Sequence, residues 1–179
     1  MKKIKQFGLT VTIALTLVLS SCSSDSSSSS GGSGSLGTFK AKIGSTNFTS
    51  IPQAANAILA SNGTFQNLSI SGADATGKSF ILTIIGENIG VGTYSISDQS
   101  STIASGTYSE VNLSNPAAGA QVWGAPYDGG GNSGSIIITA KTATNVQGTF
   151  SFTAINATTG TGTRSITNGV FNVNLTTEN

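Results

Sequence analysis

The chain has 179 residues, of which 8% are charged and none is histidine, and Cys22 is its only cysteine. The lack of histidine excludes a Ser-His-Asp triad, a His-ligated zinc site and an imidazole general base. From Cys22 onward five basic residues stand against seven acidic ones, so no basic surface is available to follow a phosphate backbone and we expect no nucleic-acid partner.

The first 21 residues have the pattern of a signal peptide that is removed on export. Three lysines among the first five residues precede an apolar run at 7–19, which is too short to span a bilayer as a mature helix. The run ends at 19–22 in LSSC, which resembles the lipobox of bacterial lipoproteins. The resemblance implies that Cys22 is acylated and anchors the chain, which we place on the outer membrane. The alternative is ordinary secretion with Cys22 as a free thiol.

A serine- and glycine-rich segment follows the cysteine. Residues 23–35, SSDSSSSSGGSGS, hold no apolar side chain and are typical of a flexible tether with a span of about 20 Å. We therefore divide the chain into a signal peptide (1–21), an acylated cysteine with its tether (22–37) and a β domain (38–179). Asp25 is the tether's only charge, whereas surface-displayed lipoproteins of Bacteroidota carry an acidic run there. The choice between the periplasmic and the cell-surface side stays open.

From Thr38 onward the sequence indicates strand after strand. Phe39, Ala41 and Ile43 occupy alternate positions, as in a half-buried strand. Lys40 and Lys42 lie between them, a feature that protects an edge strand from pairing with a foreign chain.

Residues 54–61 fit two structures. Ser50 and Pro52 are suited to begin a short helix, but Asn62-Gly63 is a strong hairpin-turn signal and alternation resumes directly after it, so we favour a hairpin. The run at 80–85 is apolar at nearly every position and predicts a central strand covered on both faces.

The remaining expected strands are separated by turns every 8 to 12 residues. They lie at 92–97, 101–111, 120–123, 135–140, 147–156 and 163–175. In the last two, Phe150, Phe152 and Phe171 fall on one side of their strands, and Thr149 and Ser151 on the other. We predict an all-β fold, a single antiparallel β-sandwich or barrel of roughly 9–11 strands.

Several segments together resemble a family of small Bacteroidota lipoproteins of unknown function. The most specific are Gly-Thr-Phe-Ser-Phe at 148–152 and Thr-Asn-Gly-x-Phe at 167–171, and the likeness covers roughly 38–175. It implies a fold and a location but no activity. Physically, the glycines indicate bends or bulges and the aromatic residues indicate a core.

The octapeptide at 72–79, GADATGKS, matches the phosphate-binding loop pattern, in which Lys78 reaches the terminal phosphates. That loop requires a helix directly after it. The β-branched run SFILTIIG follows instead, so we predict a hairpin loop and no nucleotide partner.

Carboxylates are the remaining side chains for catalysis. They are Asp74, Glu87, Asp98, Glu110 and Asp128. A glycosidase needs two carboxyl groups about 5 to 9.5 Å apart, and none of these acids stands in a recognisable catalytic context. We therefore expect no enzyme activity and no cofactor, and keep two alternatives: a carboxylate-dependent glycan hydrolase, and a barrel that binds an apolar ligand.

The segment 122–134, VWGAPYDGGGNSG, is the best ligand-contact candidate. Trp123 and Tyr127 offer aromatic faces to a sugar ring, and Asp128 and Asn132 offer polar groups to its hydroxyls. The spacing of Asp128 and Asn132 does not match a calcium loop, so we expect no metal. The competing interpretation is that Trp123 plugs one end of the core. We expect a non-catalytic binding or structural module.

Overall fold

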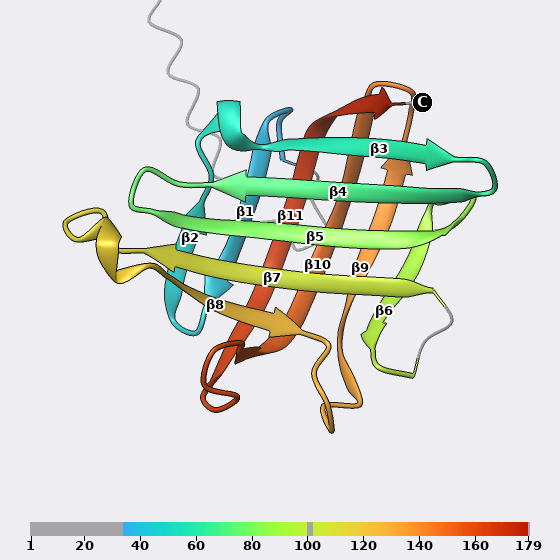
Figure 1. The fold of residues 1–179 in the computed structure, drawn as a ribbon. Coiled ribbons are helices and arrows are strands. Elements are labelled where there is room, and N and C mark those ends of the chain that lie inside the picture. The colour runs from blue at the N-terminus through green and yellow to red at the C-terminus, as the bar shows by residue number, and fades with distance from the viewer. Residues whose placement is uncertain (1–33, 100–101, 179) are drawn as a thin grey trace, which may run out of the picture. The chain divides into compact units, whose positions relative to one another are not determined.

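The computed structural model describes residues 34–99 and 102–178, which build two crossed layers of β-strands (Figure 1). The front layer holds β3 (Asn56–Asn62), β4 (Phe65–Ala73), β5 (Lys78–Glu87), β7 (Ile103–Val111) and β8 (Ala120–Ala125). The back layer holds β1 (Thr38–Ile43), β2 (Thr46–Thr49), β6 (Gly92–Ser97), β9 (Asn132–Lys141), β10 (Asn145–Asn156) and β11 (Thr163–Glu178). Two single-turn 3₁₀ helices, η1 (Pro52–Ala54) and η2 (Pro116–Ala118), complete the elements. Among the residues described, no helix has the length and apolarity needed to cross a membrane.

The two layers are joined at two corners, so all eleven strands belong to one sheet. β11 pairs with β1 and β10 along most of its length, and its last residues, 174–178, pair in parallel with β3. At the other corner Ile155 and Asn156 of β10 pair with β8. These pairings close a ring in the order β11-β3-β4-β5-β7-β8-β10. The predicted all-β class and strand number are confirmed, and the parallel pair is an addition that the alternation pattern does not reveal.

Most expected strands are present, with two local differences. β2 was not predicted, because Phe48 is its only apolar residue and leaves no alternation to detect. β2 also pairs with β1 along its outer edge, so β1 is not the edge strand that its lysines suggested. The β3–β4 hairpin is confirmed, with its turn at Gly63 and Thr64. Ser101, the expected start of β7, lies outside the described residues.

The strand at 80–85 is central in its sheet but is covered on one face, not two. β5 lies between β4 and β7, and its inward residues Phe80, Leu82 and Ile84 are buried. Ile81 on the outer face is 48% exposed. The prediction of two covered faces was therefore wrong, because isoleucine here occupies a solvent face that composition alone does not distinguish from a core face.

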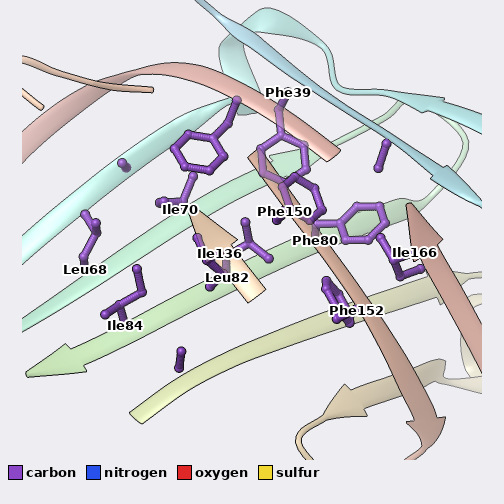
Figure 2. Packing of buried hydrophobic residues seen from close by; sticks show 14 of the residues in the cluster. Phe39, Leu68, Ile70, Phe80, Leu82, Ile84, Ile136, Phe150, Phe152 and Ile166 are labelled. Carbon is purple, nitrogen blue, oxygen red and sulfur yellow. The ribbon is translucent and has the colours of Figure 1, made fainter. Parts of the chain in front are cut away.

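The core lies between the crossed layers and is rich in aromatic rings (Figure 2). Phe39 and Phe150 of the back layer contact each other with ring centroids 5.1 Å apart, and Phe80 of the front layer lies 5.8 Å from Phe39. Phe152 and Phe171 are buried as well, whereas Thr149 and Ser151 lie on the opposite face of β10. The predicted inward positions in both C-terminal strands and the outward face of β10 are confirmed.

Glycines opposite phenylalanines make this packing possible. Within the back layer, Gly148 pairs with Phe171 and Phe150 pairs with Gly169, so the two sequence motifs face each other reciprocally. A Cβ on Gly169 would lie 2.5 Å from Cγ of Phe150. A Cβ on Gly148 would overlap both Cζ of Phe171 and the backbone oxygen of Ile137 in β9. The glycines are needed for the close approach of a ring, because any side chain would occupy the same space.

The same relation links the two layers. A Cβ on Gly72 of β4 would lie 2.6 Å from Cγ of Phe39 in β1, and a Cβ on Gly106 of β7 would lie 2.7 Å from Cε1 of Phe152 in β10. Beside the Phe150–Gly169 pair, β11 is bulged and Asn168 takes a positive φ of 52°, which confirms the bend expected of this motif.

Candidate functional site

Three inward-facing rows of the core end in charged residues at one end of the closed sheet. On β5, Lys78 lies two positions before the buried Phe80. On β7, Glu110 lies two positions after the buried Tyr108, and it pairs with Lys78. Since side chains two apart in a strand share a face, both charged residues continue the inward face beyond the core.

The third row belongs to β11, where Arg164 lies two positions before the buried Ile166. These strand ends surround an open cleft of about 500 Å³. We call this cleft the mouth, and its lining residues are Ile43, Gly44, Ser45, Thr46, Lys78, Tyr108, Glu110, Thr163, Arg164 and Ser165. The back layer contributes the β1–β2 turn and the start of β11, and the front layer contributes the charged ends of β5 and β7.

Tyr108 forms the floor of the mouth and is fully buried, with its hydroxyl donating a short hydrogen bond to Oε1 of Glu110. Burial raises the pKa of Tyr108 far above its usual range, and the hydrogen bond to Glu110 and the charge of that carboxylate raise it further. The charge of Arg164 opposes this shift. Tyr108 is therefore a neutral hydrogen-bond donor at physiological pH, and Glu110 is held in place by it.

Trp123 lies beside this floor and is only 4% exposed. Its ring stacks on Tyr108 with centroids 5.5 Å apart, and the guanidinium carbon of Arg164 lies 4.8 Å from the Trp123 ring centroid. The guanidinium is thereby held at the mouth by a cation–π contact, although Arg164 itself is exposed.

The predicted ligand segment at 122–134 is divided by the fold. Trp123 belongs to β8 and packs in the core. Its ring therefore does not present the exposed face that sugar stacking needs, and its position agrees with the competing interpretation, in which Trp123 fills one end of the core. Tyr127 is half-buried and Asp128 is exposed on the β8–β9 connection, outside the ten residues that line the mouth. Asn132 is exposed and lines a separate, smaller depression with Ser95, Ser97 and Gln99. The four residues do not form one site.

The phosphate-loop-like octapeptide is a turn between β4 and β5, as predicted. The Asp74 carboxylate accepts hydrogen bonds from the backbone N–H groups of Thr76 and Lys78, at 2.8 and 3.0 Å. Gly77 has a φ of 89°, which suits glycine. Strand β5 follows the turn directly, with the Ser79 hydroxyl 2.7 Å from that of Ser109. The motif's residues thus have structural roles, apart from Lys78, whose side chain lines the mouth.

Two of the candidate carboxylates, Asp74 and Glu110, lie near Tyr108, and the other three lie elsewhere in the domain. Asp74 caps its turn, Glu110 accepts from Tyr108, and Glu87 lies at the opposite end of β5 from Lys78. Asp98 and Asp128 are exposed. Within residues 34–99 and 102–178, no three acidic, cysteine or histidine side chains gather as a metal site would require.

The sequence reasoning missed the mouth as a site. Glu110 was considered only as one acid among five, Lys78 only as part of a false motif, and Arg164 not at all. A usable signal was present: a charged residue two positions beyond the last buried residue of an alternating strand marks the end of its inward row. This signal becomes specific once the register brings several such row ends together.

Fold and site together define an all-β domain whose closed sheet carries a polar cleft at one end. A family model described as a domain of unknown function (DUF6252) matches residues 36–173, and the chain belongs to this family. The match spans β1 to β10 and most of β11, so it includes the mouth and the reciprocal glycine motifs. No curated protein matches the chain. No solved structure matches it either.

The buried hydrogen bond of Tyr108 predicts a specific dependence of stability on pH. An unfolded tyrosine ionises near pH 10, whereas folded Tyr108 keeps its proton to higher pH. The contribution of Tyr108 is therefore complete below about pH 10 and is lost as the pH rises further. We expect the difference in unfolding free energy between wild type and Tyr108→Phe to shrink by about 1.4 kcal/mol between pH 8 and pH 11. Urea denaturation of both proteins measures it, and a constant difference would contradict the assignment.

Proposed function

We propose that the chain is an outer-membrane lipoprotein of Bacteroidota, anchored through acylated Cys22, whose β domain is a non-catalytic binding module. The proposal of an anchor rests on the lipobox-like sequence at 19–22 and the serine- and glycine-rich tether after it. Cys22 and the signal peptide lie outside the described residues. An acylated cysteine suffices for stable attachment when several chains are present, because each buried methylene contributes about 0.8 kcal/mol.

The observation that carries the binding function is the polar mouth at one end of an otherwise apolar interior. Buried aromatic rings from both layers fill the space between them, which favours a ligand at the mouth over an apolar ligand enclosed in the barrel. A cleft of about 500 Å³ lies in the range of small-molecule sites. Charged groups on three strands converge there, and a rigid sheet holds them in place.

A binding role is also more consistent with the carboxylates than hydrolysis is. Glu110 is the acid that lines the mouth, and its oxygen accepts from Tyr108. Asp74, near enough to raise the pKa of Tyr108, has its Oδ1 engaged by backbone N–H groups. A glycosidase needs one carboxyl group free as an acid and another free as a base or nucleophile.

The anchor predicts the behaviour of one variant. Wild-type chain should fractionate with membranes and be extracted by detergent, whereas Cys22→Ala should be found as soluble or uncleaved protein. Ser23→Ala, one position further along, is the matched control and should behave as wild type. Cell fractionation followed by mass determination of the mature chain measures both effects. If Cys22→Ala partitioned with membranes as wild type does, the anchor would be wrong.

Binding at the mouth predicts a fluorescence response. Trp123 is the only tryptophan, and the Arg164 guanidinium lies over its ring, so a ligand that contacts Arg164 should change Trp123 emission. Titrating the full-length chain with a panel of envelope saccharides and peptides should give at least one saturable response.

Two variants distinguish the mouth from the β8–β9 connection. Thr46→Tyr places a bulky side chain in the mouth lining and should abolish the response. Tyr127→Ala alters the connection and should leave it intact. The reverse pattern, or no response to any member of the panel, would argue against a binding site at the mouth.

A further inference from the structure

The mouth combines an excess of positive charge with a ring of hydroxyl groups. Lys78 and Arg164 line it together with one carboxylate, that of Glu110, so the lining carries one formal positive charge in excess. Cys22 to Asn179 as a whole has two more acidic than basic residues, which makes this local excess unusual for the chain. Opposite charge attracts ligands into such a cleft and orients them.

Arg164 is arranged to bind a planar anion. The guanidinium carbon lies 4.8 Å from the Trp123 ring centroid, and the Trp123 ring in turn stacks on Tyr108. The contact with Trp123 is a cation–π contact, and the fork of N–H donors on the guanidinium matches the two oxygens of a carboxylate. Because the contact with Trp123 restrains the side chain before binding, less conformational entropy is lost when a ligand arrives.

Lys78 offers the second cation from the opposite layer. Its backbone N–H is held by Asp74, and its side chain is half-buried, with Nζ 3.4 Å from Oγ1 of Thr76. This long contact to a neutral hydroxyl is weak. Lys78 lines both the mouth and an adjoining cleft that Thr76 also lines, so its flexible side chain can bring the ammonium to an anion in the mouth, where Arg164 offers the guanidinium fork.

The rest of the rim favours a polyhydroxylated ligand. Four exposed hydroxyl side chains line the mouth, namely those of Ser45, Thr46, Thr163 and Ser165. Hydroxyls donate and accept, as sugar hydroxyls do, and the second oxygen of Glu110 adds an acceptor for them. An acidic peptide would bring backbone amides and apolar side chains, for which this rim offers few partners.

We propose that the mouth binds a carboxylated saccharide of the uronic-acid type, with its carboxylate between Arg164 and Lys78 and its hydroxyls on the serine and threonine rim. This inference rests on the proposed binding function and adds the class of ligand. The binding is non-covalent, and the selectivity comes from the carboxylate.

Calorimetric titration of the full-length chain with galacturonic acid oligomers and with their methyl esters tests the proposal at low ionic strength. The ester keeps the ring and hydroxyls and removes the charge. We expect the free acid to bind at least tenfold more tightly than the ester, and the difference to shrink as salt is added.

Arg164→Gln and Lys78→Met should each weaken binding of the acid at least tenfold. Lys42→Met, which removes an exposed lysine of β1 outside the mouth, is the matched control and should bind as wild type.

The outcomes separate the ligand class from the binding function. Equal binding of acid and ester, lost in Thr46→Tyr, would overturn the uronic-acid proposal and keep the mouth as a site. Equal binding of inorganic phosphate or a short polyglutamate would replace the saccharide with a general anion and overturn it too. Unchanged affinity in both Arg164→Gln and Lys78→Met would place the ligand elsewhere. Binding of a peptide without binding of any saccharide would overturn the uronic-acid proposal alone. No heat and no change in Trp123 emission with any saccharide or peptide would overturn both proposals.

Discussion

The whole structure depends on phenylalanine rings that lie against glycine backbone. Four glycines, on β4, β7, β10 and β11, each leave the space that one ring occupies. Two of these pairs join β10 to β11 reciprocally, and two cross from one layer to the other. Large rings can therefore fill a narrow interior without pushing the layers apart, and close packing of this kind is what a unique core requires.

A filled interior determines where chemistry can occur. Since rings occupy the space between the layers, polar side chains on the inward rows are displaced to the strand ends, where Lys78, Glu110 and Arg164 meet at the mouth. The Tyr108–Trp123 stack and the cation–π contact of Trp123 with Arg164 connect the last rings of the core to a charge at the mouth. The polar cleft on which the proposed binding function rests is therefore a consequence of the same packing that stabilises the fold.

The strands were largely predictable from the sequence, and the site was not. Alternation in residues such as Phe39, Phe152 and Phe171 reports burial directly, because it needs only the local two-residue repeat. The exposure of Ile81 was not predicted, because it is an apolar residue on a solvent face. The short strand β2 was not predicted either, because it has a single apolar residue. The mouth depends on register between strands far apart in sequence. Trp123 was misleading in the opposite way: as the only tryptophan it suggested a ligand contact, but it is buried in the core.

The most direct test is a double-mutant cycle on one glycine–phenylalanine pair, because the central claim is that the glycine exists for the ring. Gly106 and Phe152 suit it, since the three atoms nearest to a Cβ on Gly106 would all belong to that ring. Gly106→Ala alone should destabilise by about 1–3 kcal/mol through overpacking. In Phe152→Leu, which removes the ring atoms concerned, the same change should cost at least about 1 kcal/mol less. Free energies of unfolding that add within about 0.5 kcal/mol would contradict the account.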